Sequence, residues 1–324
     1  MGLPVIQALD DGPGFPPDVL PRVPAPLVSV AIPLWRSRPF VRQIARNIER
    51  LDYPNLEFLI SDRHGHDDAL QVLERRFGRD PRVRCLSSSD GVGWVDHYND
   101  LLEAACGDYM MWLPHDDSVP PDYVSRLVSR LERRPEAALA FGRIVPIDLA
   151  DAPLRYSFAP ALFATRRAWA IRSSIELLFW GPAVPFRGVF RRRVVLDRGL
   201  QIRPTLGSIG ADGYWVFGLS LVGVLLYDDR AFCWKRYHPR SASASCRPDA
   251  STTADGTRVL LSYVRDLTTR RTDRLLGSAG ILAWSLVHGA HLTTCRLPPS
   301  ARDAVRRTAT RLAPAAITPG MRRR

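Results

Sequence analysis

The stretch YMMWLPHDD, residues 109–117, joins a run of apolar side chains to two adjacent carboxylates. The apolar part has the length and composition of a buried strand. Paired carboxylates at the exit of a buried strand are costly unless a cation meets them. A divalent metal ion that carries a diphosphate suits hard oxygen ligands at such a position. The two acids, Asp116 and Asp117, could instead form a turn with Ser118 and cap a helix that begins at Pro121.

Strand-like and helix-like segments alternate on both sides of this stretch. Apolar runs predict strands at 27–33, 56–61, 82–86, 109–113 and 137–141, and helical spacing predicts helices at 40–48, 67–77, 94–106 and from residue 121. This order is typical of an α/β fold with a mostly parallel sheet flanked by helices on both faces. Ligands bind beyond the carboxyl ends of such strands. We therefore expect Pro33–Trp35, Asp62–Arg63 and His115–Asp117 to meet at one edge.

The pattern changes after about residue 145. We expect a helix at 158–180, a short strand at 186–191, a helix at 212–221, one or two strands within 222–234, and two packed helices within 257–292. The predicted organisation is a flexible arm (1–26), a catalytic domain (27–245) with halves 27–145 and 146–245, a C-terminal helical segment (246–300) and a basic tail (301–324).

Composition points to an ordinary soluble enzyme, since 46% of the 324 residues are hydrophobic and 24% are charged. The five cysteines form no Cys-x-x-Cys pair, which argues against a zinc knuckle and fits a reducing compartment. The first residues lack the basic start and apolar core of a signal peptide. Serines and histidines interrupt the apolar stretch 275–292, so a packed helix is expected there. These features predict a cytoplasmic protein.

The net charge of +12 is unevenly distributed. Lys235 is the only lysine, which resembles codon bias more than a selected basic surface. Residues 296–324 hold eight arginines and the single acid Asp303, a net charge of +7. We expect a solvated tail, with peripheral contact to acidic lipids at the inner face of the membrane as the alternative. No nucleic acid partner is expected, because no basic and aromatic residues interleave.

Four segments together resemble the family 2 glycosyltransferases, which have the nucleotide-diphospho-sugar-binding GT-A fold. They are VSVAIP (28–33), LEFLISDR (56–63) followed by two aspartates, Asn99 with ACGDY (105–109), and LPHDD (113–117). Each is weak alone, but their order and spacing are specific. The resemblance covers about 28–245 and implies a GT-A, Rossmann-like, mostly parallel sheet flanked by helices, with a C-terminal helical extension.

The resemblance also implies a reaction. A metal-dependent, inverting enzyme would transfer a sugar from a nucleoside-diphosphate sugar to a hydroxyl acceptor in a polysaccharide, glycolipid or cell-wall intermediate. Mg²⁺ or Mn²⁺ would stabilise the negative charge on the leaving diphosphate. The metal ligands would be Asp116, with Asp117 in support, and His238. Asp212 would be the catalytic base that takes the proton of the acceptor hydroxyl, with helix capping as its alternative role.

The remaining site residues follow from matched positions. Those expected on the donor side are Pro33, Trp35, Asp62, Arg63, Asn99 and His115. Those expected on the acceptor side are Arg187, Gly188 and Trp215. Asp62 would bond the base or ribose, Trp35 would stack on a base or pack in the core, and Gly188 would allow close ligand approach or form a bulge.

The chain departs from the family pattern at two acidic positions. Pro114 replaces the first acid of the Asp-x-Asp motif, so His115 could take part of its role. Arg63 replaces a second aspartate and could contact the diphosphate. A catalytically degenerate sugar-nucleotide-binding module therefore stays open, as does a nucleotidyltransferase, although the segment 32–37 lacks the glycine-rich loop of that class. A polyanion-binding protein driven by the arginines is a third alternative.

Overall fold

The computed structural model describes residues 24–63, 65, 67–87, 93–154, 183–241 and 248–295, with side chains to residue 289 at the C-terminal end. Most of the expected N-terminal arm, the helix expected at 158–180 and the basic tail lie outside the described residues.

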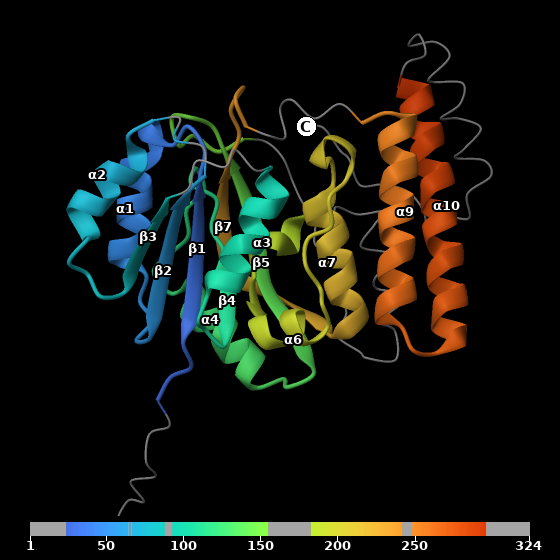
Figure 1. Cartoon of the computed structure of the whole chain (residues 1–324), viewed down its shortest axis with the longest axis horizontal. Helices are drawn as coiled ribbons and strands as arrows, with labels where there is room; N and C mark the ends of the chain where they lie inside the picture. The colour runs from blue at the N-terminus through green and yellow to red at the C-terminus, as the bar shows by residue number, and fades with distance from the viewer. Residues whose placement is uncertain are drawn as a thin grey trace, which may run out of the picture.

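One mixed sheet runs through the molecule (Figure 1). Its seven strands are ordered β3-β2-β1-β4-β6-β5-β7. The strands are β1 (Val28–Leu34), β2 (Leu56–Asp62), β3 (Val83–Ser87), β4 (Tyr109–Trp112), β5 (Ala137–Ile147), β6 (Val189–Arg191) and β7 (Val224–Arg236). Only β6 is antiparallel to its neighbours, β4 and β5. The α/β fold class with a mostly parallel sheet is therefore confirmed.

Helices cover both faces of the sheet. One face carries α1 (Val41–Arg50), α2 (Ala69–Phe77) and α4 (Tyr123–Glu132). The opposite face carries α3 (Trp94–Ala104), α6 (Arg192–Asp197) and α7 (Ala211–Val222). Short 3-10 turns lie at η1 (Arg38–Phe40), η3 (Val184–Arg187) and η4 (Leu206–Ser208).

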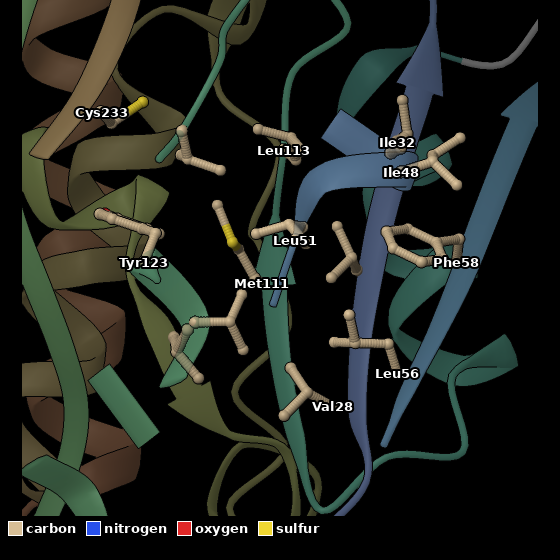
Figure 2. Close-up of a cluster of buried hydrophobic side chains, with 14 of the residues drawn as sticks. Val28, Ile32, Ile48, Leu51, Leu56, Phe58, Met111, Leu113, Tyr123 and Cys233 are labelled. Carbon is tan, nitrogen blue, oxygen red and sulfur yellow. The ribbon is translucent and has the colours of Figure 1, made fainter. Parts of the chain in front are cut away.

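This double cover explains why the strands read as continuous apolar runs rather than as alternating ones. In β1, Val30 and Ile32 belong to the core under α1, whereas Ala31 belongs to the core under α3. Figure 2 shows Ile32 with Phe58 of β2 in the first of these cores. A fully buried side chain of this size contributes about 1.5–3 kcal/mol to folding.

Two further helices extend the second face, α9 (Ala250–Leu267) and α10 (Arg271–Cys295). A capping box between Asp249 and Thr252 begins α9. Helix α9 lies between α7 and α10 (Figure 1). The expected C-terminal helical extension is thus present. Among the described residues, no helix is both long enough and apolar enough to cross a membrane.

The second half of the chain joins the same sheet rather than forming a sheet of its own. β7 pairs in parallel with β5 over nearly the whole length of both strands, with a register shift after Gly142. A Cβ at Gly142 would lie 2.4 Å from the Ala231 carbonyl oxygen, so the bulge requires a glycine. The division into halves at residue 145 stays a prediction.

Candidate active site

The carboxyl ends of β1, β2, β4 and β7 lie at one edge of the sheet (Figure 1). Asp62 ends β2 and pairs in register with Leu34, the last residue of β1. The segment after β4 carries Asp116, and the segment after β7 carries His238. The parallel sheet therefore brings together segments that are more than a hundred residues apart in the sequence.

Asp116 and His238 are in direct contact at this edge. The Nε2 atom of His238 lies 3.1 Å from Oδ2 of Asp116. The ring of Phe40 lies tilted against the rings of both His238 and His115, with centroids 5.4 Å apart in each case. A carboxylate oxygen of Asp116 and a ring nitrogen of His238 therefore lie side by side, next to the ring of Phe40.

Asp117 is oriented away from this contact, into the protein. Its side chain is 1% exposed, and Oδ2 accepts a hydrogen bond from Nε of Arg187 at 2.5 Å. The backbone N–H of Arg236 donates to Oδ1 at 2.9 Å. Burial raises the pKa of the Asp117 carboxyl, and the charge of Arg187 opposes that shift. The buried ion pair joins the end of β4 to η3 and β7.

This ion pair corrects two expectations. Asp117 was expected as a metal ligand, but both of its oxygens already accept hydrogen bonds in the interior. Arg187 was expected to bind the acceptor, but its side chain is 11% exposed and is used by Asp117. Both residues are positioning residues that hold the segment carrying Asp116.

Arg236 fixes the segment that carries His238. Its guanidinium donates to the carbonyl oxygens of Asp116 and Asp148 at 3.1 and 2.6 Å, and to Oδ1 of Asp151 at 2.6 Å. Arg236 is 5% exposed, so its bonds to the two carbonyl oxygens form away from bulk water, whereas its partner Asp151 is exposed. Arg236 therefore ties the segment that carries His238 to the segment that carries Asp116.

Asp212 lies in the first turn of α7, directly after Gly210 and Ala211. Gly210 has φ +73°, a left-handed conformation that favours glycine, and it ends the loop from which α7 starts. Asp212 is half-buried, and its Oδ1 accepts a hydrogen bond from the N–H of Gly213 at 2.9 Å. The first turn of a helix stabilises negative charge.

Lys235 and Tyr98 lie within the electrostatic influence of the same three aspartates. The charges of Asp116, Asp117 and Asp212 all act on the Lys235 ammonium and on the Tyr98 hydroxyl. Burial lowers the pKa of Lys235 to about 8, and the charge of Arg187 adds to this effect. Burial raises the pKa of Tyr98. The three carboxylates therefore all lie within electrostatic range of Lys235 and Tyr98.

Lys235 was not among the expected site residues. Its ammonium nitrogen lies 4.8 Å from the centre of the Tyr237 ring, a cation–π contact. The sequence could have pointed to Lys235, because it is the only lysine of the chain and every other residue in the Lys and Arg total is an arginine. A lysine with a lowered pKa can change charge near neutral pH, which an arginine cannot do.

Two expected acceptor residues belong to the core. Trp215 is 0% exposed, and its indole N–H donates to the carbonyl oxygen of Leu200 at 2.8 Å. Its ring packs edge-on against Phe190. A Cβ at Gly188 would lie 2.4 Å from the carbonyl oxygen of Ala140, so strand β5 requires this glycine. The expected contacts of Trp215 and Gly188 with the acceptor are corrected accordingly.

Asn99 also has a different role from the expected one. Its amide nitrogen donates to the carbonyl oxygen of Ile202, and its amide oxygen accepts from the N–H of Ile202, both at 2.9 Å. These paired bonds tie α3 to the loop that leads to α7. Asn99 therefore positions the Asp212 segment and does not offer its side chain to a donor.

The other donor-side residues lie at the expected edge. Asp62 is 7% exposed and accepts a hydrogen bond from the N–H of Gly65 at 3.0 Å. Arg63 pairs with Asp100 at 2.9 Å. Pro33 is buried within β1, whereas Trp35 is 44% exposed beside the edge. The guanidinium of Arg36 lies over the Trp35 ring, 5.7 Å from its centre. The exposure of Trp35 shows that the alternative of a core tryptophan is wrong, and stacking on a base stays a prediction.

The Asp116 carboxylate and the His238 ring nitrogen fit a divalent metal ion that a phosphate group also binds. Among the described residues, no three His, Cys, Asp or Glu side chains form a metal-binding group. Mg²⁺ sites commonly use one or two carboxylates, substrate phosphates and water rather than a complete protein cage. Asp116 with His238 supplies a partial donor set of that kind.

Comparison with known proteins agrees with this arrangement. The family model described as glycosyl transferase family 2 matches residues 29–195, which is just over half of the chain. The protein belongs to glycosyl transferase family 2. An uncharacterized glycosyltransferase of Haemophilus influenzae is 26% identical over 108 residues, which cover 33% of each chain. Chondroitin synthase of Pasteurella multocida is 30% identical over 99 residues, which cover 31% of this chain and 10% of the synthase. The chain spans a third or less of these two curated relatives.

Solved structures of other glycosyltransferases share the fold. The fragment 1–349 of S. aureus TarS, in complex with UDP-GlcNAc, superposes with a TM-score of 0.64 at 11% identity, over 85% of this chain and 77% of the fragment. The mannosyltransferase PcManGT from Pyrobaculum calidifontis, in complex with GDP-Man and Mn²⁺, gives 0.53 at 15% identity, over 88% and 80%. At these identities the likeness shows the fold alone, and the expected GT-A architecture is confirmed.

Proposed function

We propose that this family 2 protein is an inverting, metal-dependent glycosyltransferase that transfers a sugar from a nucleoside-diphosphate sugar to a hydroxyl of a polysaccharide, glycolipid or cell-wall intermediate. The observation that carries the proposal is the contact of Asp116 with His238 where the parallel strands end, at 3.1 Å. Asp212 supports it, because it lies in the first turn of α7 and its charge acts on the same Lys235 as that of Asp116. The nucleotide sugars named with TarS and PcManGT support the donor class.

In the proposed mechanism, Asp116 and His238 would hold a divalent ion, which would neutralise negative charge on the diphosphate leaving group. Lys235 adds a positive charge on the same side. Asp212 receives the proton of the acceptor hydroxyl as that oxygen bonds to the anomeric carbon from the face opposite the diphosphate. Asp117, Arg187 and Arg236 hold these groups in place.

The donor can be identified by thermal stability, because a ligand that binds only the folded state raises the unfolding temperature. UDP-GlcNAc and GDP-Man with Mn²⁺ are the first donors to test, followed by dTDP- and CDP-sugars. Release of the nucleoside diphosphate, with transfer to an acceptor, supports the proposed function. Donor binding without turnover across the whole panel would instead favour a degenerate sugar-nucleotide-binding module.

Replacing Asp116 by asparagine is expected to weaken Mn²⁺ binding in the presence of UDP or GDP by at least about tenfold. Loss of a residue that only orients a ligand already costs 10- to 100-fold in metal affinity. Electron paramagnetic resonance of free Mn²⁺ measures the change directly. The matched control is Asp122→Asn, which removes an exposed carboxylate that pairs with Arg126. Equal Mn²⁺ affinity of the two variants would remove Asp116 from the metal site.

The rate is expected to depend on the charge of Lys235. Because the pKa of Lys235 is lowered to about 8, its ammonium is present below that pH and is lost above it. We expect kcat/KM for the donor to fall as pH rises through about 8, since the free enzyme then loses a cation that faces the diphosphate. Lys235→Arg should retain the charge and move this limb to higher pH. Lys235→Met should have a low kcat/KM that does not fall further as the pH rises through about 8. An unchanged pH profile in both variants would contradict the role of Lys235.

A further inference from the structure

Helix α10 exposes an unusual number of large apolar side chains. Leu275, Leu282 and Leu286 are 65%, 51% and 75% exposed. Leu276 and Val287 add exposed fractions of 60% and 57%. These five side chains are most of the exposed large hydrophobic residues among those described. We call them the α10 apolar face.

The α10 apolar face is a continuous stripe. At 100° per residue its members fall within an arc of about 140° on one side of the helix. Ile281 and Trp284 lie on the other side and are buried, at 0% and 6% exposure. Trp284 packs edge-on against Tyr214 of α7, so the inward side of α10 is used by the fold. The outward side has no such partner among the described residues.

The described charges nearest to the face lie where α10 begins and are mostly basic. From Leu275 to Cys295 the helix contains no Asp, Glu, Lys or Arg. Arg270, Arg271 and Arg274 are exposed where α10 begins, with Asp273 as the single acid there. The sequence after Cys295 carries a net charge of +7. An apolar stripe between two basic ends suits a surface that is apolar inside and anionic outside.

We propose that the α10 apolar face binds the surface of an anionic lipid bilayer. Its leucines would insert at the headgroup boundary, and the flanking arginines would contact acidic headgroups. A second copy of the chain suits the face less well, because a symmetric pair of α10 helices would bring two sets of arginines together and offers only Asp273 of each copy to match them.

Vesicle flotation with the full chain tests the proposal. Vesicles of phosphatidylcholine mixed with phosphatidylglycerol should bind the protein, and pure phosphatidylcholine should bind it at least about tenfold more weakly. The double variant Leu282→Glu/Leu286→Glu should lose about tenfold or more of the partition coefficient. Leu196→Glu, which changes a leucine that is 38% exposed on α6, should partition as wild type does. Added salt should weaken binding.

Circular dichroism shows whether the double glutamate variant is folded. If it is not, the milder double variant Leu282→Ser/Leu286→Ser takes its place and should also bind the vesicles more weakly. Wild-type partition by a folded double variant would overturn the proposal, as would failure of the wild type to bind anionic vesicles. Sedimentation velocity tests the alternative that a second copy of the chain covers the α10 apolar face. A wild-type dimer that the double variant converts to a monomer, without vesicle binding, would assign the face to a second copy.

Discussion

Replacing Asp212 by asparagine is expected to reduce kcat for sugar transfer by about 10²- to 10⁴-fold, the usual contribution of a positioned general base. Asparagine has nearly the same shape and can still accept the hydrogen bond from the N–H of Gly213. The start of α7 should therefore be preserved, and only the capacity to accept a proton is lost. Single-turnover assays with the donor selected by thermal stability measure this directly.

Two comparisons make the Asp212 result interpretable. Asp197→Asn changes an exposed carboxylate at the end of α6 and should leave kcat unchanged. The Asp212→Asn variant should bind the nucleoside diphosphate with Mn²⁺ as wild type does, because Asp212 acts on the acceptor side. Wild-type turnover by Asp212→Asn would show that its place in α7 is only structural.

Replacing Arg187 by methionine is expected to destabilise the protein by about 3–5 kcal/mol at pH 7, because the change leaves the Asp117 carboxylate buried without its partner. Urea denaturation followed by tryptophan fluorescence measures the free energy of unfolding. Asp117 and Arg187 also join three elements around the site, so the same variant should lose activity.

The matched control is Arg265→Met, which removes the same kind of ion pair at the surface. Arg265 is 73% exposed and pairs with Asp266 at 2.7 Å. Exposed pairs contribute about 0–1 kcal/mol, so this variant should be nearly neutral. The double variant Asp117→Leu/Arg187→Met should recover part of the lost stability, because no unpaired charge remains. Similar losses for Arg187→Met and Arg265→Met would contradict the importance of burial.

The strand pattern of this fold can be predicted from the sequence because both faces of the sheet are buried. Mostly apolar runs such as those in 28–34 and 56–60 then coincide with strands, and Asp62 marks the carboxyl end of the second. The edge at which Asp62 and Asp116 lie follows from parallel pairing alone. The antiparallel β6 is harder to predict, since three residues carry little periodicity.

Side-chain direction is what the sequence could not provide. Asp116 and Asp117 are adjacent and chemically identical, yet one contacts His238 and the other enters the core to meet Arg187. Trp215 lies one helical turn from Asp212 but faces Leu200. Asn99 matches a family position, and its partner is the backbone of Ile202, about a hundred residues away. Such contacts depend on tertiary packing that no local pattern encodes.

A crystal structure with Mn²⁺ and the intact donor tests the central claim most directly. The account predicts that the metal lies between the diphosphate and the Asp116–His238 pair, and that the carboxylate of Asp212 faces the anomeric carbon from the side opposite the diphosphate. A sugar whose anomeric carbon is turned away from Asp212, or a metal bound away from Asp116, would contradict it.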